Sequence, residues 1–588
     1  MSAFLPQFDP DPTARATARD AARLKYQFNY TFVSPLAVID RVPREHEFSH
    51  EWLKVVGDRI LFVLSNRIDL EGKTEFSEYL RSKHSLLTKA IAWGAELFLG
   101  VLREMVTDSL KFTLRSTARP DRPTALSAYS DLFRSIGLPP ISATTPSDPA
   151  FAHMRVAGPN PVMLQRIRAL DDRLPLTEAE YQRVVPGDSL AAAGAEGRLF
   201  LADYQPLHGA VMGTYPHDVQ KYVYAPLALF VTDRTTRQLR PVAIQCKQTP
   251  GPDNPVFTPD DGHNWLIAKT VVEIADGNFH EAVTHLARTH LLIEPFVICT
   301  YRQLAANHPL FVLLAPHFDG TLAINDASWR HLIANKGAVD QLFGGTIETS
   351  RQLAASGVQS YLFNESMLPK ALADRGTDSA ETLPEYHYRD DARLYWDAIQ
   401  KWVSDYLALY YPTDGEVQSD PELKAWLAEI GADTGGRVSG FGVGTAAPTR
   451  AYLIDAVTMI LFTCSVQHAA VNFPQYDVMS YVPAMPLAGY SPAPTSKTGA
   501  TPADHLAMFP PMDMAELQME LGYMLGTVHY TTLGEYPANY FLDPRVAEPL
   551  TQFQKQLAEI GRTIEQRNTT RLPYHTLSPS GIPQSINI

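Results

Sequence analysis

Cysteine is scarce in this chain of 588 residues, and basic residues are outnumbered by acidic ones. The three cysteines, Cys246, Cys299 and Cys464, are too few for a disulfide scaffold. Each has apolar neighbours, so we expect buried, unreactive thiols. With 50 Lys and Arg against 64 Asp and Glu, the net charge is −14. This balance argues against a nucleic-acid partner and against tight adhesion to anionic lipid.

Long apolar runs are also rare, and the N-terminus lacks the basic and apolar regions of a secretory signal. One run, Ala451 to Phe473, is long enough to cross a bilayer, but it carries Asp455, His468 and Asn472. Because core helices are also apolar on all sides, we expect a buried central helix there rather than a membrane span. These features predict a cytoplasmic protein.

The remaining pattern is mainly helical. Residues 1–120 contain amphipathic stretches, Glu51 to Asn66 and Glu78 to Leu110, and short runs rich in Val, Tyr and Leu between Arg198 and Gln248 predict a small sheet or ribbon. Stretches rich in Pro, Gly, Ser and Thr at 119–161 and 412–449 are expected to be loops.

The C-terminal segment Leu572 to Ile588 contains no charged side chain and three prolines. It is therefore not a helix. It could be a free tail or an extended segment threaded into the protein, and composition does not choose between the two.

Histidine is concentrated in one region, where five of the 18 histidines fall within 38 residues: His280, His285, His290, His308 and His317. The first three lie in a helical stretch from about Asn264 to Glu294, which we expect to stop before Pro295. A zinc-protease helix needs histidines four residues apart, whereas these are five apart, so that class is excluded.

Five residues on an α-helix leave two side chains ~140° out of alignment. A π-helical segment, with i→i+5 hydrogen bonds, brings such residues to nearly one face and often marks a functional site. The spacing therefore predicts that, if adjacent histidines share a metal, the helix is locally π-wound. His280 and His290 cannot bind together, since ten residues rise ~15 Å.

A second helix offers His468 and Asn472, four apart and thus on one face. A buried amide needs a partner, which is either a metal or a hydrogen bond between helices. Imidazoles with oxygen donors and no thiolate set suit non-haem iron or manganese better than zinc or copper.

These residues resemble the lipoxygenase family. The run His-x4-His-x4-His-x17-His-x8-His is the histidine signature of that family, and all five histidines satisfy its intervals. Similar surroundings include Trp265 to Lys269, Thr289 to Phe296, His468 to Gln475, and Gly581 to Ile588.

The resemblance implies a mainly α fold built around two long central metal-binding helices, one with a π-helical segment, and a small β region. It covers residues 198–588 strongly. No N-terminal β-sandwich is visible, so the chain resembles bacterial-type members and is expected to form one catalytic domain over 1–588, with residues 1–120 as a candidate lid.

The resemblance also implies a site. Iron would be bound by His285, His290, His468, Asn472 and the terminal carboxylate of Ile588, and manganese is the less favoured metal. His280, His308 and His317 would be structural. Glu281 and Gln475 would link the ligands to the substrate cavity by hydrogen bonds.

The implied reaction is dioxygenation of a polyunsaturated fatty acid, with a metal-bound hydroxide as the base and no side-chain base. Ser328, Leu332, Val339 and Phe343 fall at pocket-lining positions. Phe343 resembles the bulky residue of members that favour tail-first entry and oxygenation near the methyl end. Met485 stands where plant members carry Arg, so a substrate carboxylate would have no partner there, which also favours tail-first entry. Ser328 matches neither the Ala nor the Gly that correlates with product stereochemistry.

Two other functions are compatible with this fold: a fatty-acid hydroperoxide isomerase, and a non-enzymatic lipid-binding protein that would be expected to have lost ligands. The expected partners are a polyunsaturated fatty acid and O2. We expect a monomer that makes at most transient contact with a membrane surface.

Overall fold

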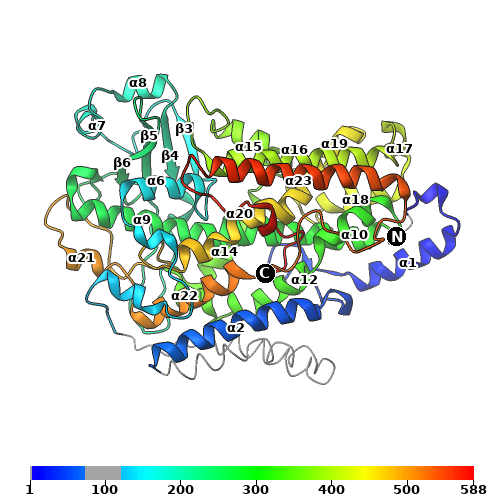
Figure 1. Cartoon of the computed structure of the whole chain (residues 1–588), viewed down its shortest axis with the longest axis horizontal. Coiled ribbons are helices and arrows are strands. Elements are labelled where there is room, and N and C mark those ends of the chain that lie inside the picture. Colours follow the sequence, from blue (N-terminus) through cyan, green and yellow to red (C-terminus); the bar gives the residue numbers. More distant parts are fainter. Residues whose placement is uncertain (1–2, 73–120) are drawn as a thin grey trace.

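A bundle of helices surrounds two long central helices in the computed structural model, which describes residues 3–72 and 121–588 (Figure 1). This agrees with the predicted mainly α fold with a small β region. The helices not discussed individually below are α7 (Glu178–Val184), α8 (Leu190–Ala195), α11 (Pro309–Leu314), α12 (Thr321–Ala327), α13 (Ala338–Leu342), α15 (Leu368–Asp374), α16 (His387–Ala408), α21 (Pro502–Leu506) and α23 (Ala547–Arg567).

The first central helix consists of α9 (His263–Phe279), a π-helix (His280–Leu291) and α10 (Leu292–Gln303). The predicted π-winding is therefore confirmed. The predicted stop before Pro295 is wrong, since the helix continues through this residue. Pro295 lies in the first turn after the π-helix, where the hydrogen-bonding register changes. Pro295 has no backbone N–H to donate to a carbonyl of the preceding turn. In that turn the carbonyl of His290 accepts a hydrogen bond from the side chain of Asn325 instead, which lowers the cost of the missing donor.

The second central helix extends from Arg450 to Met479. It includes α19 (Arg450–Phe462), α20 (His468–Asn472) and two π-helical segments, Thr463–Gln467 and Gln475–Met479. It is long and apolar enough to cross a membrane, but 83% of its most apolar window is buried in the protein, which confirms the predicted buried core helix. Both central helices contain π-winding, whereas the sequence indicated it in one.

The predicted sheet is confirmed as five antiparallel strands in sequence order, β3 (Leu164–Ile167), β4 (Leu199–Asp203), β5 (Leu227–Thr232), β6 (Leu239–Gln245) and β7 (Val256–Phe257). Every residue of β5 is buried. A separate pair, β1 (Phe28–Asn29) and β2 (Val38–Ile39), lies near the N-terminus. The main sheet stands at one end of the molecule, beside α6, α7 and α8 (Figure 1).

Two predicted loops contain helices. The stretch 119–161 includes α6 (Asp148–Ala157), which begins at a capping Ser147 with Pro149 in its first turn. The stretch 412–449 includes α17 (Asp414–Ser419) and α18 (Pro421–Gly431), capped by Thr413 and Asp420. Pro and Ser indicated loops by composition, but here they lie at the N-termini of helices.

The N-terminal region contributes α1 (Pro12–Lys25) and α2 (His50–Leu70). The second amphipathic stretch predicted there, Glu78 to Leu110, falls outside the described residues. Helix α2 lies along one edge of the bundle (Figure 1). It approaches α22 (Met512–Thr527), to which it is joined by the buried ion pair between Arg67 and Glu520, 2.5 Å.

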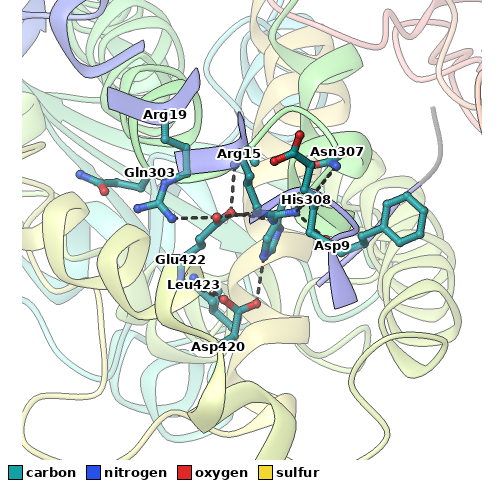
Figure 2. Close-up of polar contacts among 12 residues, drawn as sticks. Asp9, Arg15, Arg19, Gln303, Asn307, His308, Asp420, Glu422 and Leu423 are labelled. Atoms are coloured by element: carbon teal, nitrogen blue, oxygen red, sulfur yellow. Dashed lines mark hydrogen bonds and ion pairs between the residues drawn. The ribbon is translucent and has the colours of Figure 1, made fainter. Parts of the chain in front are cut away.

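Helix α1 is held by a buried polar network shown in Figure 2. Arg15 donates to both carboxylate oxygens of Glu422, at 2.7 and 2.8 Å, and Arg19 also donates to Glu422 at 2.7 Å. In the same region His308 contacts Asp420, 2.9 Å from Nε2 to the carboxylate. His308 therefore ties α18 to the chain before α11.

The C-terminal segment is threaded into the protein, which decides between the two alternatives left open by composition. All residues from Ile582 to Ile588 are buried. The Trp52 indole donates to the carbonyl of Asn587 (2.6 Å), and the Thr321 hydroxyl donates to that of Ile586 (2.9 Å). At Gly320 a side chain would collide, since its Cβ would lie 2.9 Å from Cβ of Asn587.

Candidate metal centre and fatty-acid cavity

Three imidazoles from the two central helices converge at one point. The Nε2 atoms of His285 and His290 lie 3.3 Å apart, and those of His290 and His468 lie 3.2 Å apart. All three residues are buried, and their ligand atoms lie within 4.8 Å of one another. The π-helix brings His285 and His290 to one face, as the spacing predicted, while His280 is outside the cluster.

The other ring nitrogens of two of these histidines face oxygen acceptors. Nδ1 of His285 is 3.3 Å from a carboxylate oxygen of Glu281, and Nδ1 of His290 is 2.9 Å from the amide oxygen of Asn325. Asn325 is oriented by its own donation to Glu294, 2.7 Å. Protons therefore reside on Nδ1, and each Nε2 presents a lone pair.

Burial keeps the three imidazoles neutral, the state in which histidine binds metal. Desolvation, followed by the neighbouring His285, lowers the pKa of His290 to about 3. Burial and the other two histidines lower the pKa of His468 well below its usual value, and burial lowers that of His285. Three neutral acceptors facing one another repel, so a cation at their centre is what makes this arrangement favourable.

Asn472 lies one turn after His468 and is fully buried. Its amide donates to the carbonyl of Leu525 (2.9 Å), and its oxygen accepts from Gln475 (2.8 Å). One lone pair on that oxygen remains available. The hydrogen bond between helices that the sequence offered as an alternative is thus present, and it orients the amide without using up its acceptor capacity.

The chain terminus reaches the same place. Ile588 is 7% exposed, its backbone lies beside His468, and it borders the cavity that His285 and His290 also line. A carboxylate there would add a negative oxygen donor to three nitrogens. Three ring nitrogens ~3 Å apart fit a divalent or trivalent ion with bonds of ~2.1 Å, and nitrogen and oxygen donors together suit such an ion.

Glu281 and His280 flank the cluster. Burial alone would raise the pKa of Glu281, but the adjacent His280 and His285 outweigh it and lower the value to about 2. His280 Nε2 contacts the carbonyl of Val471 at 2.8 Å, which joins the two central helices. His317 is also turned away from the cluster, with Nδ1 2.9 Å from the carbonyl of Gln584 in the C-terminal segment.

An apolar cavity of about 80 Å³ adjoins two of the three imidazoles, those of His285 and His290. Its lining includes all four residues predicted for the pocket, Ser328, Leu332, Val339 and Phe343. Met485 is fully buried but does not line it; the nearest lining residue in sequence is Leu487. The side chain of Met485 packs beside Gly277 instead, so it does not lie at the end of this cavity.

A second apolar cavity, of about 50 Å³, continues from the first and shares Ser328, Leu332 and Ile588 with it. Its far side is formed by Trp52 and Val56 of α2. Together the two cavities form an apolar path from α2 past the histidines toward Phe343. Leu521 and Leu525 of α22 line both cavities, and no spacing in the sequence pointed to either of them.

The sequence interpretation also missed Asn325, which supports His290 from 35 residues away. Local sequence offers no signal for such a contact, since it depends on how α12 packs against the π-helix. The cysteines match expectation: all three are buried, and burial raises the pKa of the Cys246 thiol to about 12.

Comparison with known proteins decides the family. The model of the lipoxygenase family matches residues 142–583. The chain belongs to the lipoxygenase family. Members are dioxygenases that typically use non-haem iron, and the histidine cluster fits that cofactor.

Individual relatives agree with this assignment. A linoleate 9/13-lipoxygenase of Pseudomonas aeruginosa is 41% identical over 510 residues, covering 82% of this chain and 73% of the relative. A hydroperoxide isomerase of Mus musculus is 36% identical over 448 residues, covering 75% of this chain and 62% of the relative. A lipoxygenase crystallised anaerobically in complex with arachidonate superposes with a TM-score of 0.86 at 28% identity, covering all of this chain and 84% of that one.

Proposed function

We propose that this lipoxygenase adds O2 to polyunsaturated fatty acids with a 1,4-pentadiene unit, such as linoleate or arachidonate, to give conjugated hydroperoxides. The observation that carries the proposal is the convergence of the His285, His290 and His468 Nε2 atoms beside an apolar cavity that also contains the chain terminus.

The proposed iron ligands are His285, His290, His468, the amide oxygen of Asn472 and the carboxylate of Ile588. Iron held by these residues, as Fe2+ or Fe3+, would supply the one-electron redox chemistry needed to activate the doubly allylic C–H bond of the substrate. Manganese would fit the same donors but is less favoured. No side chain has to act as a base; the buried residues orient the donors and exclude water.

The cavity positions the substrate. An apolar path is suited to an acyl chain, and this one is lined by His285, His290 and Phe343. We propose that the methyl end enters first, that Phe343 limits its depth, and that oxygenation occurs near the methyl end. Holding one methylene beside the metal site is the main contribution of the protein to selectivity.

Glu281 and Gln475 are proposed to couple the ligands to the cavity. Glu281 holds His285 and lines the cavity, and Gln475 donates to the Asn472 oxygen at 2.8 Å. Through these hydrogen bonds a substrate in the cavity would alter the orientation of two ligands.

A second candidate is isomerisation of fatty-acid hydroperoxides, which the 36% identity to the mouse hydroperoxide isomerase favours. The same ligands and cavity would serve it, with a hydroperoxide in place of the fatty acid and O2.

The test uses purified protein of measured metal content with linoleate, following oxygen uptake together with conjugated-diene absorbance. Uptake with diene formation supports the dioxygenase. Loss of added hydroperoxide without uptake supports the isomerase, and neither reaction with a metal-loaded protein contradicts both. His468→Ala should abolish activity, while the exposed His575→Ala should leave it unchanged.

A further inference from the structure

A second, polar cavity lies behind the π-helix. Arg288 stands between His285 and His290 in sequence, yet the two cavities that it lines share no residue with the cavity beside the imidazoles. The inner one, of about 200 Å³, is bounded by Arg288 and Arg375, with Tyr361 and Tyr388 among the other lining residues.

Both guanidinium groups in this cavity have buried N–H groups without an acceptor. Nε of Arg288, and Nε and Nη2 of Arg375, donate no hydrogen bond to any residue that the structure describes. Neither guanidinium forms an ion pair with a carboxylate in residues 3–72 and 121–588. The two positive charges therefore line one cavity and repel each other.

Other buried arginines of this protein are neutralised. Arg155 pairs with Glu273 and Asp276, at 2.5 and 3.0 Å, and Arg198 pairs with Asp188 at 2.7 Å. Arg288 and Arg375 are half-buried and form no such ion pair, so each bears part of the cost of desolvating a charge, and an anion between them would offset it. The side chain of Arg288 is positioned over the rings of Tyr361, at 5.5 Å, and Phe279, at 5.9 Å, which orient the guanidinium but do not neutralise it.

We propose that Arg288 and Arg375 form a binding site for a doubly charged oxyanion, with a phosphate group as the ligand of matching charge. Guanidinium groups donate paired hydrogen bonds to such oxygens. The cavity volume of about 200 Å³ exceeds several times the ~30 Å³ that one water occupies, so a phosphate group has room.

A path to this site exists at the surface. An outer cavity of about 420 Å³ shares Arg288 and Ser360 with the inner one. The exposed residues Gln205, His208 and Gln352 line it. A phosphate, free or carried by an ester, would enter there rather than through the fatty-acid cavity.

Occupancy would join the π-helix to Arg375, the residue that follows α15. Because Arg288 lies in the segment that carries His285 and His290, the anion would stabilise the winding on which their convergence depends. The proposal does not rest on the proposed dioxygenase activity, since binding is measured directly.

The test is isothermal titration calorimetry of the full chain, at measured metal content, with inorganic phosphate and with glycerol 3-phosphate at constant ionic strength. We expect one phosphate group per chain and at least tenfold weaker binding in Arg375→Gln and in Arg288→Gln. The exposed Arg562→Gln, on α23, is the matched control and should bind as the parent does.

Tighter binding of glycerol 3-phosphate would assign the site to a phosphate ester, and tighter binding of inorganic phosphate to the free ion; either supports the proposal. Absence of binding to the parent, or equal binding in all three variants, would overturn it. Should Arg288→Gln fold poorly by circular dichroism, Arg375→Gln, which lies outside the π-helix, decides the outcome.

Discussion

The Nε2 atoms of His285 and His290 lie 3.3 Å apart although the residues are five positions apart on one helix. An α-helix would point them ~140° away from each other, so the contact exists only because His280–Leu291 is π-wound. The packing of α14 (Ile347–Gln359) on this segment fits the same winding: at Gly357 an added Cβ would lie 2.9 Å from Cβ of Ala287.

The terminal carboxylate can be tested by extending the chain. One glycine added after Ile588 moves the carboxylate away from its buried position beside His468, so we expect iron content and activity to fall at least tenfold. Metal analysis and oxygen uptake measure both. Ile588→Val keeps the carboxylate and should keep the iron; an extended protein with full iron would remove Ile588 from the ligand set.

Asn325 should control iron binding through His290. In Asn325→Ala the proton on Nδ1 of His290 loses its acceptor, and loss of such a support typically costs about 10–100-fold in metal affinity. Competition with a chelator gives the affinity. Asn364→Ala removes a comparable hydrogen bond, to the carbonyl of Gly442, far from the histidines and should have no effect on iron.

Phe343 should set the depth of the fatty-acid cavity. Phe343→Ala lengthens the cavity, so a chain entering by its methyl end slides further, and the oxygenated carbon moves away from that end. Chromatographic analysis of the hydroperoxides from linoleate or arachidonate measures the shift. The exposed Phe32→Ala serves as control, and an unchanged product ratio in Phe343→Ala would contradict tail-first entry.

Arg15 should stabilise the packing of α1 on α18. Its loss leaves Glu422, which is 1% exposed, with Arg19 as its remaining ion-pair partner. Breaking a buried pair costs about 3–5 kcal/mol. Because Arg19 still pairs with Glu422, Arg15→Ala should lower the free energy of unfolding by about 3 kcal/mol, the lower end of this range. Chemical denaturation measures it. Arg562→Ala, at an exposed position, should change stability by less than about 0.5 kcal/mol.

Half-buried His153 should make stability fall in mild acid. Burial, followed by the charge of Arg571, lowers its pKa to about 4 in the folded protein, against 6.5 when unfolded. Between these values the unfolded chain binds more protons, so stability is lost as pH falls below 6.5 and the loss is complete below about 4.

The size of this effect is on the order of 2 kcal/mol between pH 7 and pH 5, from the difference in proton uptake. His153→Phe, which preserves an aromatic ring against His387, should lose that much less stability than the parent over this interval. Denaturation at both pH values measures the difference. An identical pH dependence in the two proteins would show that folding does not lower the pKa of His153.

Much of the metal-binding chemistry follows from residue types and spacing. Histidines five apart on an apolar helix require π-winding if they are to share an ion, and His468 and Asn472 one turn apart require no more than an ordinary helix. Periodicity and composition likewise indicated the small sheet and the buried helix 451–473, because these depend on contacts near in sequence.

Tertiary packing decided the rest. Whether the uncharged segment 572–588 was free or threaded depended on a groove formed by Trp52, Gly320 and Thr321, which are more than 260 residues away. Contacts between residues far apart in sequence also decided three other features. They paired His290 with Asn325, placed Met485 outside the cavity, and brought Arg288 and Arg375 to one cavity. Local sequence specifies winding and polarity, but which polar groups meet is set by how distant helices pack.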